Sequence, residues 1–170
     1  MIDTAPDDRR RAALLHEKGD ILHTAGDPQA ARTLYEEALK YDGDNWVTLN
    51  NLAYLLSDDL NEAQAALPYA RRAVALVDSA SALDTLGWIY VGLGDYTTAI
   101  AELSRALRHD PDAALTLYHL GEAYRRNAQF TEAIDVLESA RAPARIQGND
   151  ELLRDIERAI ERSETRQDRP

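Results

Sequence analysis

Small and apolar residues recur along the chain with a period of 34 residues, as between Gly87 and Gly121. The residues that share this register are Gly19, Gly87 and Gly121; Gly26 and Gly94; Ala31, Ala99 and Ala133; Ala38, Ala106 and Ala140; Asp27 and Asp95; and Asp42 and Asp110. Within a period the large apolar residues follow one another at three or four positions, which is the spacing of one helix face. The pattern predicts an all-α protein made of tandem helix pairs.

The most regular period carries a motif that continues into the next one. It reads Leu83-x2-Leu86-Gly87-x2-Tyr90, Gly94-Asp95-Tyr96, Ala99-x3-Leu103-x2-Ala106 and Asp110-Pro111, and the next period has Leu117, Leu120-Gly121, Tyr124, Phe130, Ala133, Leu137 and Ala140. From about residue 12 to 147 the chain resembles the tetratricopeptide repeat (TPR) family. The second unit and the run at 83–88 resemble bacterial members. The resemblance implies a right-handed α-solenoid of about four helix-turn-helix repeats.

The chemistry of the motif fits two antiparallel helices joined by a tight turn. Small residues at Gly87 and Ala99 let the two helices approach closely. Gly94 can adopt the left-handed conformation that ends the first helix, and Asp95 can cap the second. Pro111 cannot continue a helix and therefore closes the unit.

The period divides the chain into consecutive segments. We predict a partly disordered segment at 1–11, repeat units at 12–45, 46–79, 80–113 and 114–147, a capping helix at 148–163 and a disordered tail at 164–170. The capping helix is predicted because Leu152, Ile156 and Ile160 share one face while charges cover the other, as the end of a repeat array requires. The tail contains no apolar residue that could pack.

Two units depart from the pattern. The first has Lys18 where a large apolar residue is expected before the glycine. In the second, the stretch 57–61 carries one extra residue, and a short turn at 77–79 must restore the register. We place Pro68 in the first turn of a helix starting near Ala65, where its missing N–H costs little.

Charge and composition limit the classes of partner. The net charge of −11 and the lack of a basic stripe argue against nucleic acid and anionic membranes, and favour a basic or neutral protein partner. Without cysteine there is no disulfide framework and no thiolate chemistry. The charged N-terminal residues do not form a signal peptide, and no apolar run is long enough to cross a membrane. We expect a cytoplasmic protein, or a periplasmic one if an export signal was removed.

Candidate catalytic groups are sparse. The histidines at 16, 23, 109 and 119 include no pair four residues apart, which a helical metal site would use, so they are interpreted as surface or partner-facing residues. No nucleophile elbow, phosphate loop or dinucleotide motif is present. We expect neither enzymatic activity nor a bound cofactor or metal.

The resemblance implies that the first helix of each unit lines a concave, peptide-binding groove. The candidate groove residues are His16, Asp20, His23, Asn50, Asn51, Tyr54, Asp84, Trp88, Tyr118, Glu122 and Arg125, with Glu17, Asp58, Thr85, His119 and Arg126 on the same faces. Tyr54, Trp88 and Tyr118 either form an aromatic stripe that anchors partner side chains or pack between neighbouring units. Trp88 is the better anchor candidate, because other apolar residues already account for the packing in its unit.

Polar groove positions give a coarse indication of the ligand. Asn50 and Asn51 can bond a peptide backbone through both donor and acceptor. Chaperone-binding TPR domains use a carboxylate clamp, of which only Asn51 matches here, so a C-terminal Glu-Glu-Val-Asp ligand is disfavoured. Arg125 and Arg126 either hold a carboxylate or simply complement the end of their helix.

Two functions are compatible with these observations. The first is an adaptor or scaffold that binds a peptide or protein segment in the groove. The alternative is a structural protein that self-assembles into a homo-oligomer through its terminal repeats or its convex face, because exposed apolar ends favour pairing.

Overall fold

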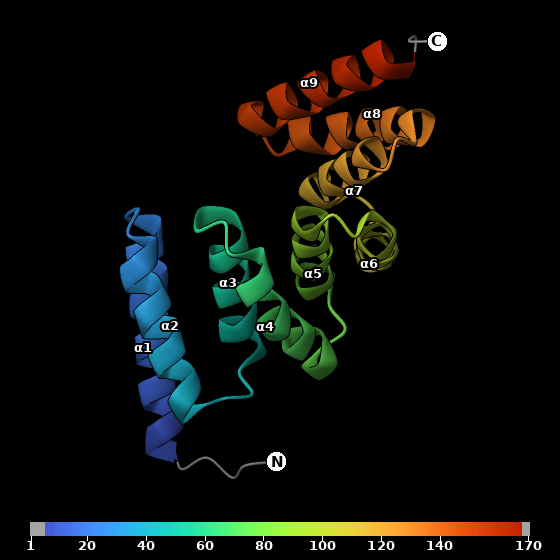
Figure 1. Cartoon of the computed structure of the whole chain (residues 1–170). Coiled ribbons are helices and arrows are strands. Elements are labelled where there is room, and N and C mark those ends of the chain that lie inside the picture. Colours follow the sequence, from blue (N-terminus) through green and yellow to red (C-terminus); the bar gives the residue numbers. More distant parts are fainter. Residues whose placement is uncertain (1–5, 168–170) are drawn as a thin grey trace. The chain divides into compact units, whose positions relative to one another are not determined.

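The computed structural model describes residues 6–167, which form helices and connecting turns without a strand (Figure 1). The elements are α1 Pro6–Thr24, α2 Pro28–Tyr41, α3 Trp46–Tyr54, the π-helical turn η1 Leu55–Asp59, α4 Ala63–Leu76, α5 Ala80–Leu93, α6 Tyr96–His109, α7 Ala114–Arg126, α8 Phe130–Ile146 and α9 Asp150–Gln167. Each predicted repeat unit therefore contains one helix pair. Within the described residues no helix has the length and apolar character needed to cross a membrane.

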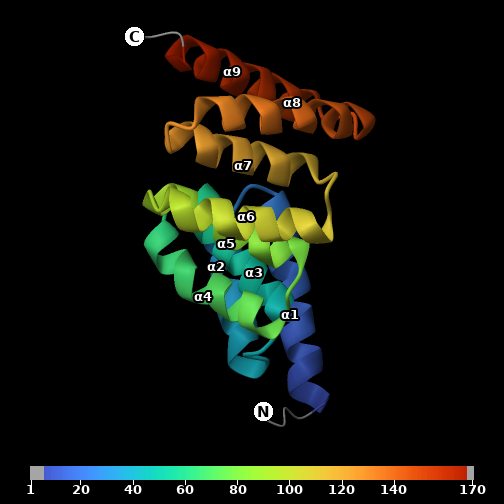
Figure 2. The same ribbon diagram turned by 90° about the vertical axis from the view of Figure 1, so that its right-hand side faces the viewer.

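The helices form two compact units, at 1–78 and 79–170. In the first unit α1 packs on α2 and α3 packs on α4, while α2 contacts α3. In the second unit α5 packs on α6, α7 packs on α8, and α9 covers α8. Figure 2 shows α7, α8 and α9 stacked in this order. In addition, α7 contacts α5 on one side and α9 on the other, so the three helices form one continuous face of the second unit.

The glycines of the repeat mark the points at which paired helices cross. A Cβ atom on Gly87 would lie 2.5 Å from Leu103 Cγ, and one on Gly121 would lie 2.5 Å from Leu137 Cγ. These distances confirm that a small residue is needed at the crossing. In the first repeat the large partner of Gly19 is Tyr35, whose ring is fully buried.

The turn between the two helices of a repeat has the predicted chemistry. Gly94 ends α5 with φ of 79°, in the left-handed region that glycine adopts without strain. The Asp95 side chain then accepts a hydrogen bond from the Thr98 backbone N–H at 3.2 Å, which caps α6. Asp27 caps α2 in the same way through the Ala30 N–H at 3.0 Å.

The second repeat absorbs its extra residue in the π-helical turn η1. A π turn holds one more residue than an α turn, so the chain can lengthen without losing the helix. Ala66, Ala70 and Ala73 consequently face the core although they come one position late. The predicted placement of Pro68 was wrong, because α4 begins at Ala63 and Pro68 lies in its interior. This proline is exposed, so water can satisfy the carbonyl that it leaves without a donor.

The ends of the array are more helical than predicted. α1 begins at Pro6, within the segment expected to be partly disordered, and α9 continues to Gln167, beyond the predicted boundary at 163. The prediction of a disordered tail was wrong for residues 164–167, because α9 continues through them and the Gln167 amide donates to the Thr131 hydroxyl of α8 at 3.1 Å. Residues 1–5 and 168–170, which also fall in the predicted disordered segments, lie outside the described residues.

Candidate functional site

The predicted groove residues form two clusters, one in each unit. In the first unit they lie on α1 and α3, next to residues of α2 and η1. In the second unit they lie on α5 and α7, and their neighbours extend to α9.

Asp20 is the centre of the first cluster. Its carboxylate accepts hydrogen bonds from the Tyr35 hydroxyl at 2.6 Å and from the Asn51 amide at 3.2 Å, and it lies 3.2 Å from His16 Nε2. Burial and the bond to Asp20 both raise the pKa of Tyr35, so its hydroxyl stays protonated and remains a donor. Asp20 therefore joins helices α1, α2 and α3.

The two histidines of α1 also reach the second repeat. His16 Nδ1 lies 3.0 Å from the Thr48 hydroxyl, and His23 Nε2 lies 2.8 Å from a carboxylate oxygen of Asp59 in η1. The π-helical turn thus places Asp59 against α1. The two histidines form contacts between repeats instead of converging on one site.

The predicted residues of α3 differ in exposure. Asn50 is buried, only 7% exposed, so little of it is accessible from outside the protein. Tyr54 is exposed and its hydroxyl donates to Asp58 at 3.2 Å, with its ring centre 6.2 Å from that of His23. Tyr54 is therefore the exposed aromatic side chain of the first cluster.

His119 organises the second cluster. It is only 5% exposed, and its Nδ1 lies 3.0 Å from a carboxylate oxygen of Asp84 on α5. The Trp88 ring stacks on the imidazole with centres 4.1 Å apart and planes 17° apart. The interpretation of His119 as a surface residue was wrong, because α5 covers it through Asp84 and Trp88.

Trp88 has features of both alternatives considered for the aromatic residues, namely packing between neighbouring repeats and exposure on the surface. It packs between repeats through His119, yet it is only half-buried, so part of the ring faces solvent. The Arg126 guanidinium lies 5.8 Å from the ring centre, within the range of a cation–π contact. Tyr118 is half-buried against the apolar core formed by α7, α8 and α9, and burial raises its pKa.

Glu122 is 4% exposed and holds both arginines at the end of α7. It accepts hydrogen bonds from Arg125 Nε at 2.8 Å and Nη2 at 2.9 Å, and from Arg126 Nε at 3.4 Å. Burial by itself would raise the pKa of Glu122, but these bonds and charges outweigh it, and the net result is a lowered pKa. The same hydrogen bonds raise the pKa of Arg125.

The acidic residues of both clusters are thus already engaged by protein groups. Asp20, Asp84 and Glu122 each have a donor within hydrogen-bonding distance. Residues 6–167 contain no group of three or more histidine and carboxylate side chains placed to hold a metal ion. The aromatic side chains of the clusters remain accessible, since Tyr54 is exposed and Trp88 and Tyr118 are half-buried.

Comparison with known proteins shows what kind of fold carries these clusters. The family model described as "Tetratricopeptide repeat" matches residues 16–81 and 85–148, which is most of the chain. The chain belongs to the tetratricopeptide repeat family. No curated protein matches the sequence.

Solved structures of other TPR proteins are similar over most of this chain. MamA is 24% identical with a TM-score of 0.68, covering 92% of this chain and 94% of that one. YrrB, described as a TPR protein with an unusual peptide-binding site, is 23% identical with a TM-score of 0.70, covering 86% and 74%. The first TPR of Spaghetti (RPAP3), bound to the HSP90 peptide SRMEEVD, is 22% identical with a TM-score of 0.69, covering 75% and 99%. These similarities show the predicted TPR solenoid fold.

At one position of the 34-residue repeat, the first and fourth repeats have a different type of residue from the second and third. This position follows the small residue at the helix crossing and holds Asp20, Tyr54, Trp88 and Glu122 in successive repeats. The two outer repeats use it for a carboxylate bound by neighbouring side chains, whereas the two inner repeats use it for a partly exposed aromatic ring.

Several residues of the clusters were not predicted from the sequence. Tyr35 and Asp59 come from α2 and η1, outside the helices expected to line the groove. Arg162 and Arg166 on α9 lie close to Arg125. Their spacing of four residues was an available signal, but the predicted capping helix ended near the first of them.

Proposed function

We propose that this TPR protein is a non-catalytic adaptor that binds a peptide or protein segment. The observation that carries the proposal is the setting of Trp88, whose ring is partly exposed and held in place by the buried His119 and by Asp84. A rigid aromatic ring offers a large contact area with little loss of conformational entropy on binding. The peptide bound to the RPAP3 repeat and the peptide-binding site of YrrB support this function for a chain of the same fold.

Each unit is proposed to offer its own binding surface. In the first unit the surface comprises the exposed Tyr54 and the edge of the cluster around Asp20 and Asn51, with His16 and His23 behind it. In the second unit it comprises Trp88 and the arginine side chains near Glu122. Buried residues of the predicted groove, such as Asn50, are proposed to position the exposed residues beside them.

The proposed partner is basic or neutral where it meets most of this chain. The net charge of −11 supports this, since a protein with a strong negative field attracts cationic segments. The carboxylates of Asp20, Asp84 and Glu122 are already bound by protein donors. The argument for a basic partner therefore rests on the net charge of the whole chain and not on an acidic groove. That the protein is bacterial and that it is cytoplasmic both stay predictions from the sequence.

Tryptophan fluorescence can test the proposal directly, because the chain has only Trp46 and Trp88. We suggest selecting peptides from a displayed random library against the immobilised protein and titrating the best peptide against Trp46→Phe and Trp88→Phe. The Trp46→Phe variant retains Trp88 as its fluorophore and should show a change on binding. The Trp88→Phe variant reports only Trp46, at the start of α3, and should show none.

The affinity of the protein variants for the selected peptide provides the second half of this test. Trp88→Ala should weaken binding of the selected peptide by about tenfold or more, as loss of an aromatic anchor does. Trp46→Ala is the matched control and should leave the affinity within about twofold. Unchanged affinity in Trp88→Ala, with the fold retained by circular dichroism, would exclude this ring as the anchor.

Self-assembly through the terminal repeat is a second candidate function. Leu14 and Ile21, two turns apart on α1, are 52% and 62% exposed, so the first helix presents an apolar stripe. If this stripe pairs with another copy, light scattering over a concentration series should show a dimer that Leu14→Glu/Ile21→Glu abolishes. Ile146→Glu removes an isolated residue that is 87% exposed and should have no effect. A monomer at all concentrations would refute this candidate.

A further inference from the structure

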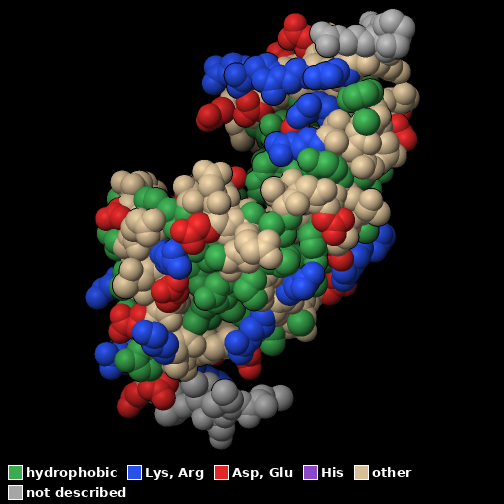
Figure 3. All heavy atoms as spheres, viewed as in Figure 1, with side chains coloured by type: hydrophobic (Ala, Val, Ile, Leu, Met, Phe, Trp, Pro, Cys, Tyr) green, Lys and Arg blue, Asp and Glu red, His purple; other side chains and the backbone are tan. Residues whose placement is uncertain are grey.

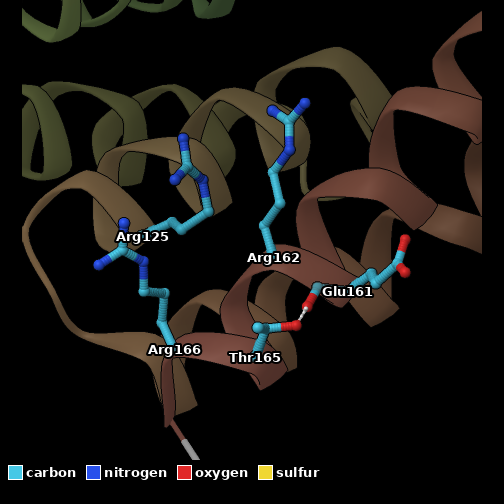
Figure 4. A pocket seen from close by; sticks show the side chains of 5 residues that line it. All are labelled: Arg125, Glu161, Arg162, Thr165 and Arg166. Carbon is cyan, nitrogen blue, oxygen red and sulfur yellow. Dashed lines mark hydrogen bonds between the residues drawn. The ribbon is translucent and has the colours of Figure 1, made fainter. Parts of the chain in front are cut away.

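A pocket of about 410 Å³ lies between the ends of α7 and α9. Its lining residues are Arg125, Glu161, Arg162, Thr165 and Arg166. Figure 4 shows the three guanidinium groups on the side of α9 that faces α7, while the Glu161 carboxylate points away from them. The pocket is therefore basic, although the chain as a whole carries a net charge of −11.

The three arginines differ in how far they are already engaged. Arg125 directs two of its nitrogens to Glu122, and its pairing leaves the remaining N–H groups for another acceptor. Among residues 6–167, no side-chain hydrogen bond or ion pair involves Arg162 or Arg166. The Thr165 hydroxyl donates to the Glu161 backbone carbonyl at 2.8 Å, so its proton is already used within α9.

The placement of Arg162 and Arg166 brings like charges together. They are four residues apart on α9, and like charges at this spacing repel one another. Figure 3 shows basic side chains gathered along α9 in the second unit, and all the basic residues of this helix are arginines. An anion in the pocket would relieve this repulsion, and the planar guanidinium groups suit the paired oxygens of a carboxylate or a phosphoryl group.

We propose that this pocket binds an acidic group of the partner peptide, either a carboxylate or a phosphorylated side chain. The inference rests on the proposed function, because the pocket continues the face of α5 and α7 that carries Trp88. Arg126 connects the two places, since it contacts both the Trp88 ring and Glu122. The partner would place an apolar or aromatic side chain at Trp88 and an acidic side chain at the pocket.

This site differs from the carboxylate clamp of chaperone-binding TPR domains, of which this chain matches only Asn51. Asn51 lies on α3, the first helix of the second repeat, whereas Arg162 and Arg166 lie on α9, the helix that follows the last repeat. A ligand that a clamp would bind by its C-terminus can here be bound through an internal acidic side chain.

The test measures binding of a fluorescein-labelled hexaglutamate peptide, acetylated and amidated at its ends, by fluorescence anisotropy at about 0.15 M salt, where distant surface charges are screened. Hexaglutamine with the same label is the uncharged control and should not bind. Arg162→Gln/Arg166→Gln should raise the Kd for hexaglutamate by about tenfold, the usual cost of losing hydrogen bonds to a charged group. Both residues are exposed, so these variants should fold like the natural protein.

A matched variant on the same helix separates the pocket from general electrostatics. Arg154→Gln/Arg158→Gln removes two exposed arginines with the same spacing and the same change in net charge, outside the pocket. It should change the Kd by less than about twofold, since screened surface charges contribute little. Equal losses in the two double variants, or no binding by the natural protein, would overturn the proposal.

Two further arms identify the ligand and separate this proposal from the adaptor function. A phosphoserine peptide should bind as tightly as hexaglutamate or more tightly. If inorganic phosphate alone binds as tightly as either peptide, the pocket is a free-phosphate site and the peptide assignment is wrong. Trp88→Ala should weaken binding of the library-selected peptide by about tenfold or more but retain hexaglutamate binding, so failure at Trp88 and failure at the pocket give different results.

Discussion

Asp20 in the first repeat and Glu122 in the fourth occupy the same place in the 34-residue period, directly after the glycine at the helix crossing. Asp20 is held by the neutral donors Tyr35 and Asn51, which come from two other helices. Glu122 is held by arginines of its own helix. In the first unit the residue at this position thus links three helices. In the second unit it binds Arg125, whose guanidinium lies close to α9.

The difference shows how a repeat protein can vary its surface without changing its backbone. The crossing glycine fixes the distance between the paired helices, and the next residue points to the same face in every repeat. What that residue does depends on which donors the neighbouring helices bring to it. The following predictions test this division between shared backbone and local chemistry.

The largest effect should come from the crossing that both repeats share. Gly121→Val places a branched side chain where the first carbon would lie 2.5 Å from Leu137 Cγ, and we expect a loss of about 3 kcal/mol in the free energy of unfolding. Urea unfolding followed by circular dichroism measures it. Adding Leu137→Ala should recover part of the space, so the double variant should lose less than the sum of the two single losses. Strict additivity would argue against this crossing as the point of closest approach.

Glu122→Gln should have the next largest effect, because it removes the charge that pairs Arg125 and Arg126 in a buried position. We expect a loss of about 2 kcal/mol in the free energy of unfolding at neutral pH. The control is Glu138→Gln, since Glu138 pairs with Arg141 at the same three-residue spacing but is exposed, and its loss should stay within about 0.5 kcal/mol. Similar losses in the two variants would mean that burial does not strengthen the Glu122 pair.

Acid should remove the contribution of Glu122. Its pKa is lowered in the folded state, so this carboxylate stabilises the fold fully above the pKa of an unfolded glutamate, about 4.3. The contribution is lost as the pH falls below that value and through the lowered folded pKa. The difference in unfolding free energy between the natural protein and Glu122→Gln should therefore shrink between pH 6 and pH 3. A difference that stays constant over this range would contradict the lowered pKa.

The smallest effect should come from the neutral donors of the first unit. Tyr35→Phe removes the hydroxyl that donates to Asp20 but keeps the buried ring, so we expect a loss of about 1 kcal/mol. Tyr41→Phe, at the end of α2, is the control and should lose less. If Tyr35→Phe matched Glu122→Gln, the two carboxylates would be equivalent and the contrast between the units would fail.

Much of the fold follows from the sequence because its signals are local. The cap at Asp95, the left-handed Gly94 and the small residues at the crossings involve neighbours within one helix pair, and the structure has all of them where the pattern indicates. The extra residue of the second repeat was also visible in the sequence. Its form as a π-helical turn, and with it the start of α4 at Ala63, required the packed structure.

The amino-acid sequence by itself determined the repeat, the helix pairing and the faces on which side chains such as Trp88 lie. Only the tertiary structure decided that His119 is buried beneath Trp88, that Glu122 is engaged by its arginines, and that Arg162 comes to lie beside Arg125. The physical reason is the range of the interactions involved. Turns and helix periodicity depend on residues a few positions apart, whereas burial and charge pairing depend on which helices meet, and α7 and α9 meet only after α8 has folded between them in the chain.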